Sequence, residues 1–351
     1  MKELKAYKKQ FDRKLTAFFN TRLQIYKKLG RGTLVPDFIK QHKIIALGGG
    51  KRFRPYLATL AYETFGGKNT TSIEEVAMGL EVFHLFALAH DDIVDKAFKR
   101  HSEVTAHIFA TQLLTDRNRL GDIAHIGQGQ GMLAGDLLLV WAHELMVGYG
   151  MSNVKRTLAL QAFRQVMDEL FVGQMIDIDL TTQDEVSLAA ITQKNVLKTA
   201  RYTFTGPLTI GARLALGKTT IDTFAGQFGE ALGIAYQTQD DLLDVTSSNN
   251  SKDMLLDISG RQHTYLTHFL QHKAKPQFRA TFNTFFGKPV GQLRAKQVQE
   301  LYTASGAVAY AQNIAKKSFV KARHLLATGP VPARRQATWR NLIDIIESRV
   351  S

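Results

Sequence analysis

Residues 81–95 read EVFHLFALAHDDIVD, an apolar run with helical spacing that ends in three aspartates. Residues 237–244 read QTQDDLLD and end in the same pattern, two adjacent aspartates and a third four positions after the first. Positions i and i+4 lie on one face of a helix, and like charges there destabilise it by about 0.2–0.5 kcal/mol. A hard cation such as Mg²⁺ removes this repulsion, especially where a diphosphate supplies its other ligands. One such motif is more often a solvated helix end, but two in apolar surroundings favour a metal site. Its predicted ligands are Asp91, Asp92, Asp95, Asp240, Asp241 and Asp244.

The rest of the chain also predicts helices. No proline occurs between Pro55 and Pro207, so the strongest helix breaker is missing from that stretch. No run of alternating strand residues stands out, and no linker divides the chain. We therefore expect one all-α domain over residues 1–351, with a basic amphipathic helix over 1–30 and a surface loop over 273–293. Further helical patterns cover residues 37–47, 52–65, 71–95, 103–118, 128–149, 152–178, 185–203, 218–244, 257–272, 295–328 and 335–349.

Composition and charge exclude some classes of function and favour others. The chain has no cysteine, which excludes disulfides, a thiolate nucleophile and Cys-ligated metals. The net charge is +14, concentrated near the two ends, with 15 Lys/Arg against 3 Asp/Glu in residues 1–60. Basic ends around a mildly acidic middle suit an anionic substrate held through cations better than nucleic acid, although solvated helix faces are an equal alternative for any one lysine. The start lacks the apolar run of a secretory signal and no spanning segment is visible, so a cytoplasmic protein is expected.

Several basic side chains are candidate phosphate ligands. Lys51, Arg52 and Arg54 follow a glycine turn in GGGKRFRP, residues 48–55, but the segment does not match a P-loop. Arginine forks and lysine charges are the usual partners of diphosphates. His84 lies two helical turns before Asp91 and so shares its face, although a core histidine is the more frequent interpretation. Other candidates are Arg100, Lys198 and Lys252.

Together these blocks resemble the trans-isoprenyl diphosphate synthases, or polyprenyl synthetases, over nearly the whole chain. The matching segments are GGKRFRP, EVFH leading into HDD, LAGD at 133–136, GQ at 173–174 with Asp177, KTARY at 198–202, and QTQDD at 237–241. The resemblance implies a bundle of long helices around a deep apolar cavity, usually in a homodimer. It also implies three Mg²⁺ ions, held by both aspartate motifs on an allylic diphosphate.

The resemblance also implies roles for individual positions. Lys51, Arg54 and His84 match residues that bind isopentenyl diphosphate, whereas Arg100, Lys198 and Lys252 match those that bind the allylic diphosphate. Thr199, Gln237 and Tyr202 match oxygen-bearing or rim positions near the developing carbocation. Asp91, Asp92, Arg100, Lys198, Thr199, Gln237 and Asp240 are therefore the expected catalytic residues.

Two positions depart from the family pattern. The family has two arginines after the first motif, but this chain has Arg100 and His101, and a histidine carries charge only when protonated. We expect weaker or more pH-sensitive isopentenyl diphosphate binding there. Counted back from Thr264, Arg261 and Gln262 stand where the family has Gly-Lys, so that lysine is absent and Arg261 is the candidate substitute.

The residues before the first motif bear on product length. Phe86 and Ala87 lie five and four residues before Asp91, a pattern that resembles geranylgeranyl (C20) synthases. On a helical wheel Phe86 lies well away from Asp91, so Phe83 is a rival for the cavity floor. We favour a C20 product, with C15 second and longer products if neither ring closes the cavity.

Three other functions compete with this interpretation. A non-catalytic partner subunit of a heteromeric synthase usually loses aspartates or basic residues that are intact here. A terpene cyclase has little use for Lys51 and Arg54, because it binds no second diphosphate. A nucleic-acid binder is suggested only by the net charge.

Overall fold

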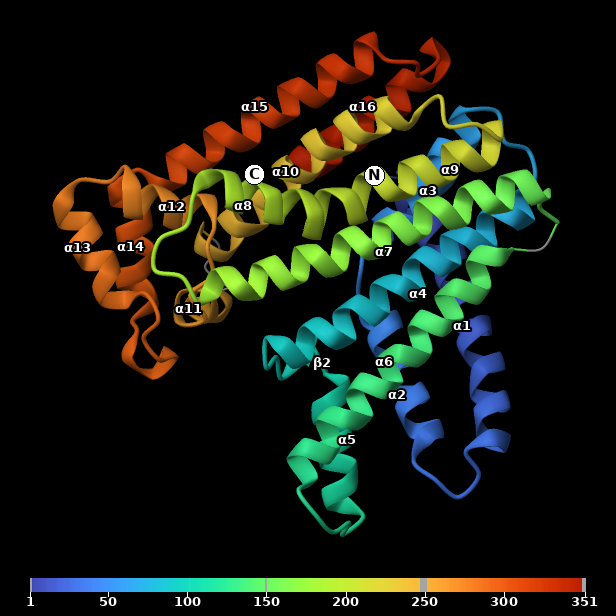
Figure 1. Ribbon diagram of the computed structural model, residues 1–351, viewed down its shortest axis with the longest axis horizontal. Helices are drawn as coiled ribbons and strands as arrows, with labels where there is room; N and C mark the ends of the chain where they lie inside the picture. Colours follow the sequence, from blue (N-terminus) through green and yellow to red (C-terminus); the bar gives the residue numbers. More distant parts are fainter. Residues whose placement is uncertain (1, 101, 149, 247–250, 349–351) are drawn as a thin grey trace. The chain divides into compact units, whose positions relative to one another are not determined.

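A computed structural model describes residues 2–100, 102–148, 150–246 and 251–348, with residues 2 and 251–254 as backbone only. The described residues are almost entirely helical, so the predicted all-α class is confirmed (Figure 1). Two compact units make up the chain: Met1–Leu60 with Lys68–Arg156, and Ala61–Gly67 with Thr157–Ser351. That they form one domain, as expected, stays a prediction.

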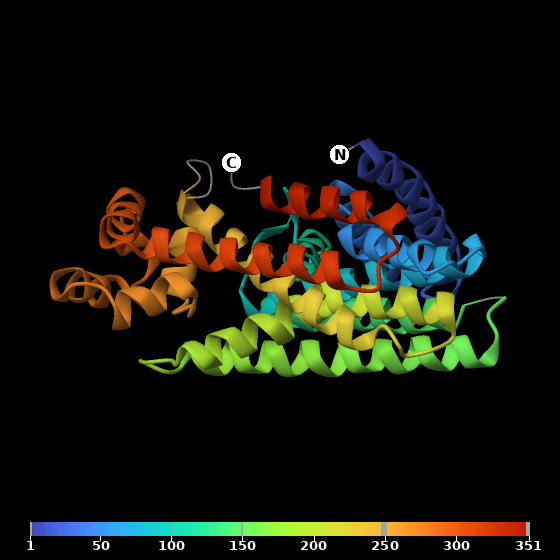
Figure 2. The same ribbon diagram turned by 90° about the horizontal axis from the view of Figure 1, so that it is seen from above.

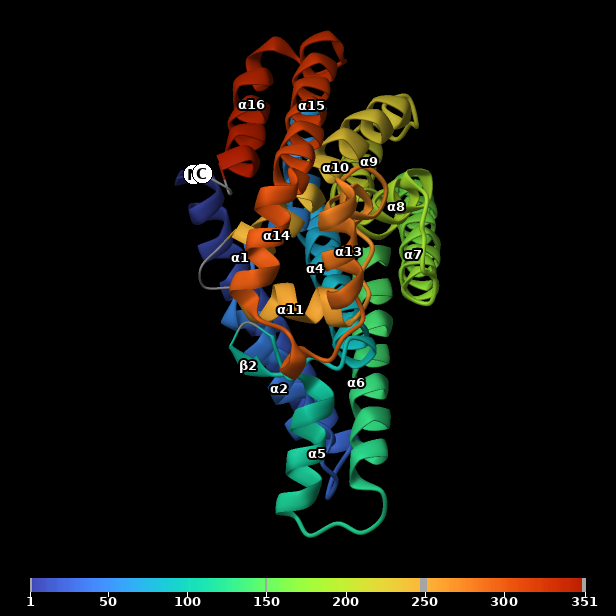
Figure 3. The same cartoon turned by 90° about the vertical axis from the view of Figure 1, so that its left-hand side faces the viewer.

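The first unit contains the N-terminal helices and a short hairpin. Its elements are α1 (Lys2–Leu29), α2 (Val35–Gly48), most of α3 (Phe53–Thr64), α4 (Thr70–Val94), β1 (Lys99–Arg100), β2 (Glu103–Val104), α5 (Ala106–Asp116) and α6 (Ile123–Val147). Helix α4 packs against α6, and α5 lies beside α6 (Figure 3). Trp141 of α6 is buried against Phe18 and Phe19, and its Nε1 donates to the Tyr26 hydroxyl at 3.0 Å. This aromatic cluster anchors the amphipathic first helix, whose predicted extent is confirmed.

The second unit is built around α10. Its elements are most of α7 (Asn153–Thr181), α8 (Leu188–Asn195), the π-helix η1 (Val196–Thr205), α9 (Gly206–Leu216), α10 (Asp222–Thr246), α11 (Ser251–Ser259), α12 (Tyr265–His272), α13 (Pro276–Phe285), the 3₁₀ turn η2 (Val290–Gln292), α14 (Ala295–Ser305), α15 (Ala307–Thr328) and α16 (Ala333–Glu347). Helix α10 packs against both η1 and α15 (Figure 2). Glycine makes the contact with η1 possible, because a Cβ on Gly233 would stand 2.2 Å from the Ala200 Cβ.

The prediction of a surface loop over residues 273–293 is wrong. Residues Pro276–Phe285 form α13, and Phe282 is completely buried. Pro276 occupies the first helical turn, where its missing N–H costs nothing and its fixed φ favours the helix.

Other predicted helices are right in type but differ in extent. The stretch 257–272 is interrupted between α11 and α12, and the stretch 295–328 is interrupted at Gly306, which adopts a positive φ of 93°. The stretch 185–203 divides into α8 and the π-helix η1.

Among the described residues, no helix combines the length and the apolarity that crossing a bilayer requires.

Candidate active site

The first aspartate motif lies at the C-terminal end of α4. Asn69 caps the start of this helix by accepting hydrogen bonds from the Thr71 and Ser72 amides. Near the other end, the partly exposed residues recur at helical spacing, so one face of α4 stays open while the opposite face is buried against α6. This open face carries His84, Ala87, Leu88 and Asp91.

Arg100 links the hairpin to the first motif. Its Nε donates to the Asp92 Oδ1 at 2.8 Å, and its Nη2 lies 3.5 Å from the Asp91 Oδ2. The Asp92 side chain is only 2% exposed. Burial raises the pKa of Asp92 to about 6, although Arg100 acts in the opposite direction. The structure thus brings three predicted site residues together, while His101 lies outside the described residues.

Arg52, one of the candidate phosphate ligands, instead holds the basic segment before α3 in place through buried contacts. Arg52 is buried, donates from Nε to Asp12 at 2.8 Å and from Nη1 to Glu81 at 2.6 Å, and also bonds the Ala46 carbonyl. It therefore ties this segment to α1, α4 and α2. Lys51 is exposed and Arg54 partly buried beside it. The buried Glu81 is the signal that could have revealed Arg52, because a carboxylate in an apolar helix requires a cationic partner.

The three candidate floor residues do not share one environment. Phe83 and Phe86 are buried and stack on each other with ring centroids 5.7 Å apart, and Phe86 also contacts the His90 ring at 4.5 Å. Ala87 is partly exposed on the same face as Asp91. A larger side chain at position 87 would extend from that open face, whereas Phe86 supports the helix from behind.

In the second unit, the aspartate motif ends α10. Asp241 is buried, whereas Asp240 and Asp244 are partly exposed one turn apart, together with Gln237. The Thr199 hydroxyl donates to the Gln237 Oε1 at 2.6 Å, and the Gln237 Nε2 donates to the Asp241 Oδ1 at 2.8 Å. This chain of bonds connects η1 to the motif and brings two predicted catalytic residues, Thr199 and Gln237, into one network with the predicted metal ligand Asp241.

The π-helix η1 carries Lys198 and Thr199. It packs closely on α7, because a Cβ on Gly173 would stand 2.5 Å from the Lys198 amide nitrogen. One turn along α7, the buried Asp177 accepts a hydrogen bond from the Lys198 Nζ at 2.6 Å. Lone π turns in proteins frequently occur at functional sites.

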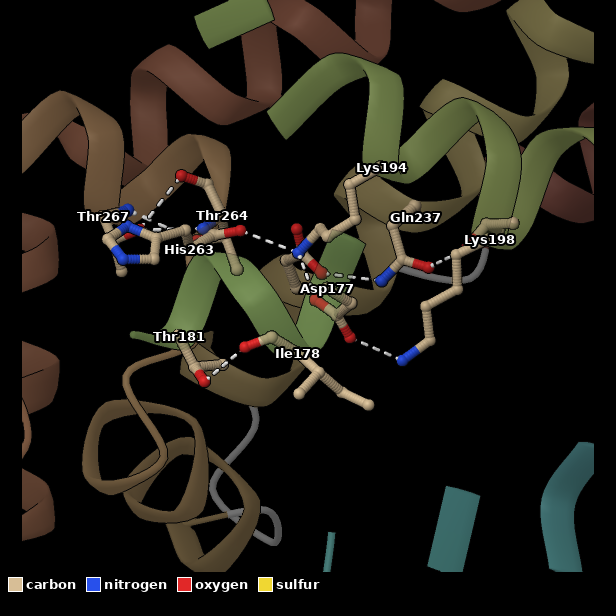
Figure 4. A network of polar contacts seen from close by, with 11 residues as sticks. Asp177, Ile178, Thr181, Lys194, Lys198, Gln237, His263, Thr264 and Thr267 are labelled. Atoms are coloured by element: carbon tan, nitrogen blue, oxygen red, sulfur yellow. Dashed lines mark hydrogen bonds and ion pairs between the residues drawn. The ribbon is translucent and has the colours of Figure 1, made fainter. Parts of the chain in front are cut away.

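Asp177 has a second cationic partner, Lys194, that the sequence did not indicate (Figure 4). The Lys194 Nζ lies 3.1 Å from the Asp177 Oδ1 and donates to the His263 carbonyl at 2.8 Å. Burial alone would raise the pKa of Asp177, but Lys194 and Lys198 outweigh it and hold the pKa below its usual value.

Arg261 does not take the place of the missing family lysine. Its Nε and Nη2 donate to the carbonyls of Thr181 and Gln183, and Nη2 also bonds Asp184 at 2.7 Å. The guanidinium therefore stabilises the end of α7. Gln262 instead lines a small cavity with Asp241 and Asp257. Lys252 lies in α11, but its side chain is outside the described part of the chain.

The donor chemistry of both motifs fits Mg²⁺. Each offers hard carboxylate oxygens at i and i+4 on one helix face, and Mg²⁺ usually takes one or two protein carboxylates and leaves its other positions to water and phosphate. Within the described ranges, no three acidic or histidine side chains converge on one point as a closed metal cage. The pairs Asp91 with Asp95 and Asp240 with Asp244 are thus candidate Mg²⁺ ligands at sites whose remaining coordination positions are open to water and phosphate.

Asp241→Asn is predicted to stabilise the metal-free protein at neutral pH. Burial raises the pKa of Asp241 to about 6, whereas the carboxylate of an unfolded chain titrates near 3.8. Ionisation therefore favours the unfolded state as the pH rises from about 4 to 6, and the wild type loses stability over this window. The variant's advantage should grow to on the order of 1–3 kcal/mol by pH 7. Thermal unfolding in EDTA at pH 4.5 and 7.5 measures this, and equal differences at both pH values would refute it.

Comparisons with known proteins identify the family of the chain. The sequence model of the family "Polyprenyl synthetase" matches residues 38–304. The chain belongs to the polyprenyl synthetase family. As a member it is a trans-prenyltransferase, so the predicted family and enzyme class are confirmed.

Relatives cover nearly the whole chain. A geranylfarnesyl diphosphate synthase of Aeropyrum pernix is 26% identical over 91% of this chain and 96% of its own. A short chain isoprenyl diphosphate synthase of Methanothermobacter thermautotrophicus is 28% identical over 78% of each chain. The crystal structure of geranylgeranyl pyrophosphate synthase from Corynebacterium glutamicum, complexed with isoprenyl diphosphate and magnesium, has a TM-score of 0.88 at 26% identity and covers 97% of this chain and 99% of that one. Dependence on magnesium is accordingly a property of the family.

Proposed function

We propose that the protein condenses isopentenyl diphosphate with an allylic diphosphate, head to tail and in the trans configuration. The observation that carries the proposal is that each aspartate motif ends a long helix and is connected to a basic residue. Arg100 bonds Asp92 in the first unit, and in the second Lys198 adjoins Thr199, which reaches Asp241 through Gln237. Carboxylates can bind a cation, and the basic side chain beside them can bind an anion. A diphosphate chelated to Mg²⁺ is a ligand of this kind.

The proposed roles follow from the chemistry of the side chains. Arg100, Lys198 and Lys252 bind the allylic diphosphate, and Lys51, Arg54, His84 and His101 bind isopentenyl diphosphate. Asp91, Asp92, Asp95, Asp240, Asp241 and Asp244 would hold three Mg²⁺ ions, which would supply Lewis-acid stabilisation of the departing diphosphate. An apolar cavity keeps water away from the reacting carbons.

The reaction requires no protein nucleophile. The bond between the allylic carbon and the diphosphate oxygen breaks, and the electron pair leaves with the diphosphate, whose charge Arg100 and Lys198 help to neutralise. The isopentenyl double bond attacks the allylic carbon, and a proton is then lost to the released diphosphate. Thr199 and Gln237 place oxygen atoms near the positive charge, in an orientation fixed by the bond to Asp241.

Incubation with both substrates tests this function. Purified protein with Mg²⁺, isopentenyl diphosphate and dimethylallyl, geranyl or farnesyl diphosphate should release diphosphate and form longer prenyl products. Absence of turnover with every primer would remove the assignment.

We propose a C15–C20 product, with C20 favoured. The relatives include geranylgeranyl and geranylfarnesyl synthases, which supports a product in or near this range. The positions proposed to set the limit are Phe86, Ala87 and Phe83.

Substitutions on the two sides of α4 should change product length in opposite directions. Ala87→Phe is predicted to shorten the product by at least one isoprene unit, because the new ring extends from the face that carries Asp91. Phe86→Ala is predicted to lengthen it, because the stacked pair with Phe83 loses one ring and the helix can shift. Chromatography of the dephosphorylated products measures both. Unchanged products from both variants would place the floor elsewhere.

We also propose that the protein is a homodimer that pairs through α6. Leu133, Val140 and Val147 are 62%, 60% and 41% exposed and recur every seven residues, so they form one apolar stripe. Beside them, a groove of about 340 Å³ between α2 and α6 has mostly apolar walls. Sedimentation should give a dimer for the wild type and a monomer for Leu133→Glu with Val140→Glu. The expected cytoplasmic location stays a prediction.

A further inference from the structure

Lys194 is a lysine of α8 whose side chain is almost completely buried, at 9% exposure. Removing an ammonium group from water costs several kcal/mol, so a buried lysine requires close polar partners. Lys194 has two of them, the Asp177 carboxylate on α7 and the His263 carbonyl before α12. It therefore connects three segments of the second unit at one point.

The two oxygens of Asp177 are divided between two lysines. Oδ1 lies 3.1 Å from the Lys194 Nζ, and Oδ2 accepts from the Lys198 Nζ at 2.6 Å (Figure 4). The ion pair between Lys194 and Oδ1 restricts rotation of the Asp177 carboxylate. The second oxygen then fixes where the more exposed ammonium of Lys198 lies, and this is the lysine proposed to bind the allylic diphosphate.

Lys194 also lies where the chain lacks a cation. Gln262 stands at the family's lysine position and lines a cavity with Asp241 and Asp257, which are both acidic. The carbonyl that Lys194 binds belongs to His263, the next residue after Gln262. The ammonium of Lys194 thus reaches, from another helix, the backbone beside the position that has lost its charge. The ammonium also interacts electrostatically with the Asp241 and Asp257 carboxyl groups.

We propose that Lys194 is a positioning residue that orients Asp177 and Lys198 for the allylic diphosphate and supplies the positive charge that Gln262 lacks. This inference rests on the proposed function, because it assigns Lys198 to that diphosphate. It goes beyond the family resemblance, which gives position 194 no role.

Kinetics of Lys194→Met test the positioning role. Methionine keeps an unbranched apolar side chain that is one atom shorter, and it removes the charge. The KM for the allylic diphosphate should rise by about tenfold or more, the loss expected for one charge-assisted hydrogen bond. The KM for isopentenyl diphosphate should stay within about twofold. Lys273→Met, which removes an exposed lysine near Tyr310 in the same unit, is the matched control and should behave like the wild type. Equal changes in both KM values, or no change, would overturn the proposal.

Placing a lysine at position 262 tests whether Lys194 supplies the charge that Gln262 lacks. The double variant Lys194→Met with Gln262→Lys should recover most of the lost affinity for the allylic diphosphate. Failure of the second lysine to restore any affinity would contradict the proposal. If Lys194→Met alone does not fold, the double variant decides: a folded protein with the wild-type KM supports charge replacement, and an unfolded one opposes it.

A binding measurement separates this inference from the proposed function. Calorimetry with inorganic pyrophosphate and Mg²⁺ needs no turnover, so it can be applied even to a protein that is inactive with every primer. If the wild type is inactive with every primer, only the proposed function is refuted. Pyrophosphate binding that is about tenfold weaker in Lys194→Met, and restored in the double variant, would still support the role of Lys194. Equal affinity in all three proteins would refute it.

Discussion

Asp91→Ala and Asp240→Ala are each expected to lower kcat by at least about 100-fold, since each removes a proposed oxygen ligand of the Mg²⁺ ions that would stabilise the departing diphosphate. Both side chains are partly exposed at helix ends, so their loss should leave the fold intact. Steady-state release of diphosphate measures the effect.

Controls for these two variants are exposed aspartates of the same units. Asp116→Ala near the end of α5 and Asp168→Ala on α7 should retain wild-type rates. A loss below tenfold at Asp91 or Asp240 would mean that the motifs are only solvated helix ends.

Arg100→Met is expected to reduce both activity and stability. The variant loses a cation proposed to bind the allylic diphosphate and leaves the buried Asp92 without its partner. We expect kcat/KM to fall by at least about 100-fold and the free energy of unfolding to fall by on the order of 1–3 kcal/mol.

A second substitution separates the two effects. Asp92→Asn in the Arg100→Met background removes the uncompensated charge, so the free energy of unfolding should recover. Because Asp92 is itself a proposed metal ligand, activity is compared between Arg100→Met and the wild type at a temperature where both are folded. An unchanged kcat/KM in Arg100→Met there would mean that Arg100 acts only on the fold and does not bind the diphosphate.

Much of the fold can be predicted because local signals agree with tertiary packing. The amphipathic pattern from Leu4 to Tyr26 predicts α1, and the proline-free stretch predicts the long helices α4, α6 and α7. The exceptions have local causes. A proline that breaks a helix and one that begins a helix look the same in a sequence, so the sequence predicts a loop at Pro276 although this residue begins α13. The π-helix η1 depends on close approach to Gly173 and Gly233, which are distant in sequence.

The candidate site divides in the same way. The aspartate motifs are visible because the repulsion of their like charges calls for a cation, and this is a local property. Lys194 is not noticed, and Arg52 is taken for a phosphate ligand, because a sequence does not distinguish a buried cation from a solvated one. Their partners, Asp12 and Asp177, lie 40 and 17 residues away along the chain. Only the fold brings these charges together.

The central claim is that each aspartate motif binds magnesium together with a diphosphate. A crystal structure with Mg²⁺ and an unreactive thio analogue of an allylic diphosphate tests it most directly. We predict metal ions on the carboxylates of both motifs, with diphosphate oxygens among their remaining ligands. A bound diphosphate with either motif solvated and free of metal would contradict the account.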